Sequence, residues 1–172
     1  MPRRFDTVQT MHAGHDRLRA LQRYKTLDTS QETGFDLIVR EAAEVCDTPI
    51  ALVSLVDSNR QWVTANPRLF LRDTDLQGSM WVKTIEHAGV FVVPDATQDP
   101  RVNFNPLVVS HPGIRFFAGA PLLTSDAFAL GTLCVADLSP RCSGLTACQA
   151  AALLRLACKT VSLLEARLTA TH

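Results

Sequence analysis

The sequence predicts an α+β domain organised around a central antiparallel β-sheet. Apolar segments with the length of strands occur in pairs joined by short turns, and amphipathic helices flank them at both ends of the chain. The length of 172 residues and the hydrophobic content of 47% fit one domain large enough to bury a core. We therefore expect a single domain over residues 15–170, preceded by a flexible arm over residues 1–14.

The composition excludes several classes of protein. Seventeen basic and seventeen acidic residues give a formal net charge of zero, which argues against nucleic-acid binding. The longest apolar runs fall short of the roughly 18 residues of a membrane span, and the first residues lack the apolar core of a secretion signal. We therefore expect a cytoplasmic protein with no nucleic-acid or membrane partner. The odd set of cysteines without a CxxC pair predicts free thiols rather than disulfides or a zinc site: Cys46, Cys134, Cys142, Cys148 and Cys158.

Two helices open the predicted domain. Leu18, Leu21 and Tyr24 have helical spacing, which predicts a short first helix. The apolar residues between Glu32 and Cys46 fall on one face of a second helix. The proline of the segment 47–49 ends that helix.

The first strands of the sheet follow directly. Residues 50–56 form a continuous apolar run, which predicts a strand buried on both faces. After a turn at residues 57–60, residues 61–65 return as its partner strand. A short helix from Met80 to His87 and a strand over residues 90–93 come next.

A long loop separates these elements from the last two strands. Residues 96–113 are rich in proline and polar residues, so we expect irregular structure with one helical turn near residues 104–108. Two long strands over residues 114–123 and 128–136 are then joined by a hairpin at residues 124–127.

The last helix, over residues 145–168, carries two apolar rows. One row has residues spaced alternately three and four apart, as in a coiled-coil seam. Because the sheet needs only one row, we predict that the other meets a second copy of the chain, unless the first helix covers it within one chain. The predicted homodimer interface comprises Leu18, Leu21, Leu154, Ala157, Val161, Leu164 and Leu168.

Several short motifs, in this order, resemble those of the GAF domain, a small-molecule sensory module of bacterial signalling proteins. They include PIALVSLVD at 49–57, VPDA at 93–96, NPLV at 105–108, IRFFAGAPL at 114–122 and LGTLCV at 130–135. The resemblance implies a GAF/PAS-like fold with an antiparallel sheet of five to six strands. Terminal helices would cover one face, and loops and short helices would roof a ligand pocket on the other.

The helix at residues 79–85 departs from the family pattern. Related domains usually read Ser-Phe-Cys-Ala-His-Ala-Ile there, whereas this chain reads SMWVKTI. Trp81 and Lys83 therefore replace the usual cysteine and histidine at the wall of the pocket. Either the pocket binds a different ligand, or Trp81 fills it and no ligand binds.

The resemblance and the side-chain chemistry together give a candidate ligand site beneath the long loop. We expect Arg115 to grip a carboxylate or phosphate, or to form a salt bridge with Asp95 or Asp99. Asp95 would contact the ligand or cap the turn that follows it. The candidate ligand-binding residues are Trp81, Lys83, Asp95, Arg101, Arg115 and Phe117.

The sequence shows no catalytic arrangement. Glu86 and His87 are adjacent on a helix and point in different directions, and Cys134 lies in an apolar strand, where thiols are usually inert. The chain also lacks the clustered cysteines of GAF domains that reduce methionine sulfoxide, and the anchoring cysteine of those that bind bilins.

We therefore expect a non-catalytic sensory or regulatory domain with no metal and no cofactor. It would bind an unidentified small molecule or a signalling protein and report through its terminal helices. Two alternatives remain, a dimerisation module with a collapsed pocket and a small GAF-type redox enzyme. An enzyme should lose activity when Cys134 or His87 is replaced.

Overall fold

The structure, a computed structural model, describes residues 33–56, 61–65, 83–85, 89–110, 113–125 and 128–170. Within these residues an antiparallel sheet of five strands has the order β2-β1-β5-β4-β3. The strands are β1 (Ile50–Val56), β2 (Gln61–Ala65), β3 (Phe91–Val93), β4 (Phe116–Leu123) and β5 (Ala129–Asp137).

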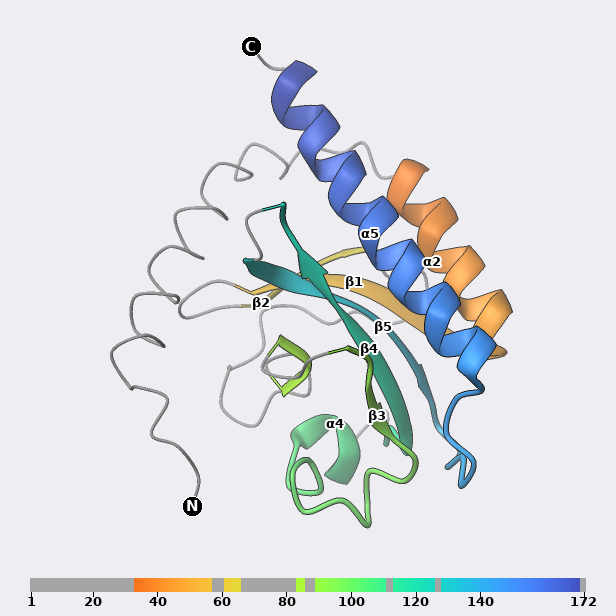
Figure 1. Ribbon diagram of the computed structural model, residues 1–172. Coiled ribbons are helices and arrows are strands. Elements are labelled where there is room, and N and C mark those ends of the chain that lie inside the picture. Colours follow the sequence, from red (N-terminus) through yellow and green to blue (C-terminus); the bar gives the residue numbers. More distant parts are fainter. Residues whose placement is uncertain are drawn as a thin grey trace, which may run out of the picture.

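Helices and loops cover the two faces of the sheet differently (Figure 1). Helices α2 (Thr33–Cys46) and α5 (Ala147–Ala170) lie side by side across one face. The short helix α4 (Pro106–Val109) and the loop around it lie on the other. The predicted α+β fold with an antiparallel sheet is therefore confirmed.

Most element boundaries agree with the sequence patterns. The predicted strand at 114–123 begins two residues late, at Phe116, since the Ile114 N–H bonds to Leu107 O in α4 at 2.8 Å instead of to a neighbouring strand. Ile114 therefore ties the sheet to α4 before the strand begins. Residues 83–85 of the predicted short helix are helical. The predicted arm and first helix lie outside the described residues.

Side chains alternate between the two faces along each strand, because the side-chain period of a strand is two residues. Val53, Phe116 and Val135 face the helices and join the core that α2 and α5 complete. Leu52, Phe117 and Cys134, each one residue away, face the loop side and join a separate apolar cluster. The sheet therefore separates two cores.

The two helices run antiparallel to each other. A Cβ on Gly34, near the start of α2, would lie 3.2 Å from Leu163, in the second half of α5. The Gln149 side chain, at the start of α5, donates to Val45 O near the end of α2 at 3.2 Å. Gln149 also forms a capping box with Thr146, since each side chain accepts the other residue's backbone N–H at 3.0 and 3.1 Å.

The predicted dimer seam on α5 needs a correction. Ala157, Val161 and Leu164 are buried in the helix-side core of this same chain, so they are not free to meet a partner. Leu154 remains 38% exposed. Leu18 and Leu21, and the side chain of Leu168, lie outside the described part of the chain. The two apolar rows merge into one wide buried face because α5 packs against both the sheet and α2.

Length and composition alone would allow α5 to cross a membrane. Its residues Ala147–Ala166 have a mean hydropathy of 1.3. However, Leu153 and Leu156 are fully enclosed against the sheet and α2, as in the core helix of a globular domain.

Candidate functional site

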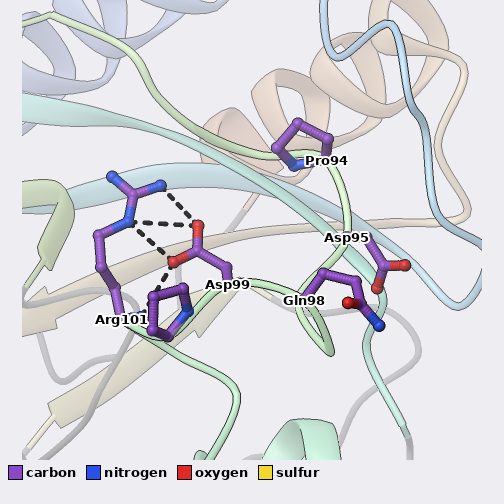
Figure 2. Close-up of a pocket in the computed structure, with 6 residues that line it drawn as sticks. Pro94, Asp95, Gln98, Asp99 and Arg101 are labelled. Carbon is purple, nitrogen blue, oxygen red and sulfur yellow. Dashed lines mark hydrogen bonds and ion pairs between the residues drawn. The ribbon is translucent and has the colours of Figure 1, made fainter.

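A shallow cleft of about 480 Å³ lies where the chain leaves β3. It is lined by Pro94, Asp95, Gln98, Asp99, Pro100 and Arg101, and Figure 2 shows these side chains. Two aspartates shape the loop by accepting the backbone N–H of the residue two positions later. Asp95 binds the Thr97 N–H at 3.0 Å, and Asp99 binds the Arg101 N–H at 2.9 Å.

The charged groups of the cleft bind each other. The Arg101 guanidinium forms a fork with the Asp99 carboxylate, with Nη2–Oδ2 at 2.5 Å and Nε–Oδ1 at 2.9 Å (Figure 2). This bond lowers the pKa of Asp99 and raises the pKa of Arg101. The Arg101 guanidinium also lies 4.6 Å from the centre of the Phe91 ring. Asp99 thus occupies one edge of the guanidinium and neutralises its charge, so an anionic ligand would compete with Asp99 for this arginine.

Asp95 caps the turn that follows it, which is one of the two roles predicted for this residue. Its Oδ1 accepts both the backbone N–H and the hydroxyl of Thr97, the second at 2.6 Å. In Figure 2 its carboxylate lies apart from the Asp99–Arg101 pair. Asp95 and Arg101 are the two predicted ligand residues that line this cleft.

Arg115 binds backbone carbonyl groups instead of the carboxylates of Asp95 and Asp99. Its Nη1 donates to Val108 O at 2.9 Å and to Ile114 O at 3.3 Å. The side chain therefore satisfies carbonyl groups at the end of α4 and fixes the loop to the start of β4. The salt bridge expected with Asp95 or Asp99 is absent, because Asp99 pairs with Arg101 instead.

Of the other predicted residues, the described ones do not line the cleft. Phe117 is fully buried in the loop-side core, edge-to-face with Phe91 at 6.3 Å between ring centres. Lys83 is partly buried on the helical segment 83–85. Trp81 lies outside the described residues, so whether it fills a pocket stays an open prediction.

A second polar feature, which the sequence analysis did not predict, lies on the loop-side face of the sheet. Ser54 on β1 and Thr132 on β5 are direct partners in the sheet register, and both are fully buried. Among the described residues, the Oγ atoms of both lack a hydrogen-bond partner, as does that of Thr48 between α2 and β1. Buried hydroxyl groups are normally paired, so this pair needs an explanation.

Gly119 and Thr84 complete this feature. A Cβ on Gly119 of β4 would lie 2.7 Å from Thr84 Oγ1 and 3.0 Å from Thr132 Oγ1. Thr84, itself fully buried, therefore sits directly over a glycine of the sheet. We call Ser54, Thr84, Gly119 and Thr132 the polar floor. The signal in the sequence was the set of small and hydroxyl residues at loop-facing positions of otherwise aliphatic strands.

The two buried thiols give no support to a redox site. Cys134 is fully buried, its Sγ lies 3.7 Å from Leu52 O, and burial raises its pKa far above the range of a reactive thiol. Burial likewise raises the pKa of Cys46. Within the described part of the chain, no three His, Cys, Asp or Glu side chains gather as metal ligands would.

Comparison with known proteins agrees with this arrangement. A relative in Pseudomonas aeruginosa, the cyclic di-GMP phosphodiesterase PA2567, is 42% identical over 127 residues, which is 74% of this chain. The chain spans only 22% of the length of that enzyme.

Solved structures share the fold at low sequence identity. The GAF domain of a phosphoenolpyruvate-protein phosphotransferase from Coxiella burnetii superposes with a TM-score of 0.67 at 15% identity, covering 94% of this chain and 98% of that one. A domain of a putative two-component sensor histidine kinase from Sinorhizobium meliloti gives a TM-score of 0.61 at 12% identity, covering 80% of this chain and 93% of that one. The family model of the GAF domain matches residues 30–163, and the chain therefore belongs to the GAF domain family.

Proposed function

We propose that this GAF domain is a non-catalytic sensory or regulatory module that binds a small molecule over the polar floor and reports through α2 and α5. The observation that carries the proposal is the pair of buried hydroxyls on Ser54 and Thr132 that have no partner among the described residues. Leaving a buried hydroxyl unpaired costs about 1–3 kcal/mol. A ligand that hydrogen-bonds to both groups would recover that free energy.

The chemistry of the polar floor favours an uncharged group on the ligand. Hydroxyls both donate and accept hydrogen bonds but carry no charge. The two arginines among the predicted ligand-binding residues already have partners, Arg101 with Asp99 and Arg115 with backbone carbonyls. We therefore propose a ligand that presents a neutral donor and acceptor to the floor, such as an amide or a hydroxyl.

The relationship to a cyclic di-GMP phosphodiesterase suggests where such a module acts. Because this chain spans 22% of that enzyme, we propose regulation of an attached or associated signalling enzyme rather than phosphodiesterase activity in this chain. Cytoplasmic location and a signalling partner remain parts of this proposal.

We also propose homodimerisation, although fewer residues of the predicted α5 seam are exposed than the sequence indicated. Of the predicted α5 residues whose side chains are described, Leu154 is the exposed one. A dimer through this face would use Leu154 together with the small exposed residues Ala151 and Cys158 on the same side of α5.

The decisive experiment is thermal unfolding in the presence of bacterial metabolites below about 1 kDa, fractionated by chromatography. A ligand at 100 times its Kd adds about 2.7 kcal/mol of stability. In a domain of this size, that raises the Tm by about 5–10 °C. We expect one fraction to do so for the wild-type protein.

The matched control is the double variant Ser54→Ala/Thr132→Val, which keeps the shape of the floor and removes both hydroxyls. We expect this variant to fold and to lose most of the shift caused by the active fraction. A fraction that stabilises both proteins equally would mean that binding occurs elsewhere. If no fraction stabilises the wild-type protein, the sensory proposal fails in favour of a dimerisation module.

A further inference from the structure

The C-terminal end of α2 is held by side chains from the segment that leads into α5. Asp47 has a left-handed φ of 51°, and the Thr48 N–H bonds back to Ala43 O at 2.9 Å, which closes the helix in a Schellman turn. The carbonyls of Val45, Cys46 and Asp47 are left over by this turn. Each of them accepts a hydrogen bond from another segment of the chain.

Arg141 supplies two of those bonds. Its Nη1 donates to Cys46 O at 2.6 Å, and its Nη2 donates to Asp47 O. A guanidinium at this position is favourable, because a helix carries partial negative charge at its C-terminus. Gln149 supplies the third bond, to Val45 O. Gln149 of α5 and Arg141 before it therefore jointly hold the C-terminal end of α2. We call this set of contacts the helix junction.

The backbone of Arg141 binds the other side of the molecule. Its N–H donates to Pro94 O at 2.8 Å, and Pro94 is the first residue of the cleft. The guanidinium also lies 5.1 Å from the centre of the Phe116 ring, and its Nη2 lies 3.5 Å from the Asp137 carboxylate. One residue thus contacts the end of β3, the end of β5, the helix-side core and the end of α2.

We propose that Arg141 couples the cleft at residues 94–101 to the α2–α5 helix pair. A change in the position of the Pro94–Asp95 peptide would then alter the hydrogen bonds that Arg141 donates to the end of α2. The proposal rests on the proposed sensory function, for which it supplies the route from the loop side to the helices. Because the Arg141 backbone is fixed to Pro94 O and its side chain to α2, movement of Pro94 pulls the guanidinium away from Cys46 O and Asp47 O. Arg141 is a positioning residue here.

The test needs no ligand, since a substitution can disturb the cleft. Asp95→Ala removes both hydrogen bonds that the Asp95 side chain accepts in the turn after Pro94, and leaves the backbone bond from the Gln98 N–H to Asp95 O in place. The readout is hydrogen exchange at the Asp47 and Thr48 amides, which bond to Glu44 O and Ala43 O within the helix junction. The amide of Ala118, in the middle of the sheet, reports changes in global stability and is used as the reference.

The design is a double-mutant cycle of Asp95→Ala with Arg141→Met. We expect Asp95→Ala to speed exchange at Asp47 and Thr48 about tenfold in the wild-type background, within the roughly 5–150-fold range of coupled sites. In the Arg141→Met background these amides already exchange fast, and Asp95→Ala should add less than about twofold. Arg155→Met, at an exposed arginine of α5, is the matched control and should leave the effect of Asp95→Ala unchanged.

Equal effects of Asp95→Ala with and without Arg141 would overturn the coupling, as would unchanged exchange at Asp47 and Thr48 in Arg141→Met. If Arg141→Met does not fold, Arg141→Lys takes its place. Lysine keeps the charge but cannot hold two carbonyls as a guanidinium does, so the same cycle applies. A failure of this cycle would leave the metabolite experiment untouched, and the converse also holds.

Discussion

The two faces of the sheet are made from alternate residues of the same strands, yet they are finished in different ways. On the helix side, the apolar side chains of α2 and α5 pack on Phe116, Leu133 and Val135 and form an apolar core. On the loop side, an apolar cluster around Phe117 and Phe91 lies next to the polar floor, where the buried hydroxyls of Ser54 and Thr132 have no partner among the described residues. The helix-side face therefore has the apolar packing that favours stability, whereas the loop-side face buries hydroxyl groups at a cost in stability.

Two of the three buried hydroxyls without a partner among the described residues lie on the loop-side face, and the third, Thr48, lies between α2 and β1. A hydroxyl on the helix side, Thr160 Oγ1, donates to Leu156 O at 2.8 Å and is satisfied within its own helix. The equally buried hydroxyl of Thr132 on the loop side has no such acceptor among the described residues. Departures from the rules of packing and pairing are expected at functional sites, and the polar floor is such a departure.

The largest expected effect is on the helix side. Leu153→Ala should lower the free energy of unfolding by about 2–5 kcal/mol, because Leu153 is fully enclosed between α5, α2 and the sheet. Its neighbour Leu154 is 38% exposed, so Leu154→Ala should cost less than about 1 kcal/mol. Guanidinium denaturation at two protein concentrations measures both. A large, concentration-dependent loss at Leu154 would instead show that a second copy covers this residue.

Gly119→Ala tests how closely the polar floor is packed. The new methyl group would lie 2.7 Å from Thr84 Oγ1, so we expect a loss of about 1–3 kcal/mol in unfolding free energy. The penalty should be smaller in a Thr84→Ala background, because the hydroxyl and methyl groups nearest the new Cβ are then removed. Equal penalties in the two backgrounds would place the strain elsewhere.

The ion pair in the cleft should make a small, pH-dependent contribution. The bond from Arg101 lowers the pKa of Asp99 below its unfolded value of about 3.9. The pair therefore stabilises the folded state above that value, and the contribution is lost as the pH falls through the folded pKa. Since Arg101 is 49% exposed, solvent screening should keep it below about 1 kcal/mol. Denaturation of the wild-type protein and Asp99→Asn between pH 2 and 6 measures it, and parallel curves would contradict the assignment.

Much of the fold was predictable from local patterns. Strand β1 coincides with the apolar run at residues 50–56, and β2 begins directly after the turn predicted at residues 57–60. The buried face of α5 was harder to predict, because its two apolar rows have the same period and only tertiary packing decides which row is buried. Residues of both rows, such as Leu156 and Leu164, face the core together.

The candidate site was less predictable, for a physical reason. Arg115 and Arg141 bind backbone carbonyls, and every residue has one, so the sequence carries no sign of the partner. Asp99 and Arg101 are two residues apart and pair locally, which the sequence did allow. The polar floor depends on the register between β1, β5 and β4, and no local pattern specifies which hydroxyls a register brings together.

The most direct test of the account compares one buried threonine from each face, Thr160→Val and Thr132→Val, by the free energy of unfolding of the ligand-free protein. The substitutions are chemically identical and both sites are fully buried. We predict that Thr160→Val lowers stability by about 0.5–1.5 kcal/mol, because it removes a made hydrogen bond. Thr132→Val should leave stability unchanged or raise it, because an apolar group replaces an unpaired hydroxyl. A loss at Thr132 as large as at Thr160 would show that its hydroxyl is already paired in the free protein, and would contradict the account.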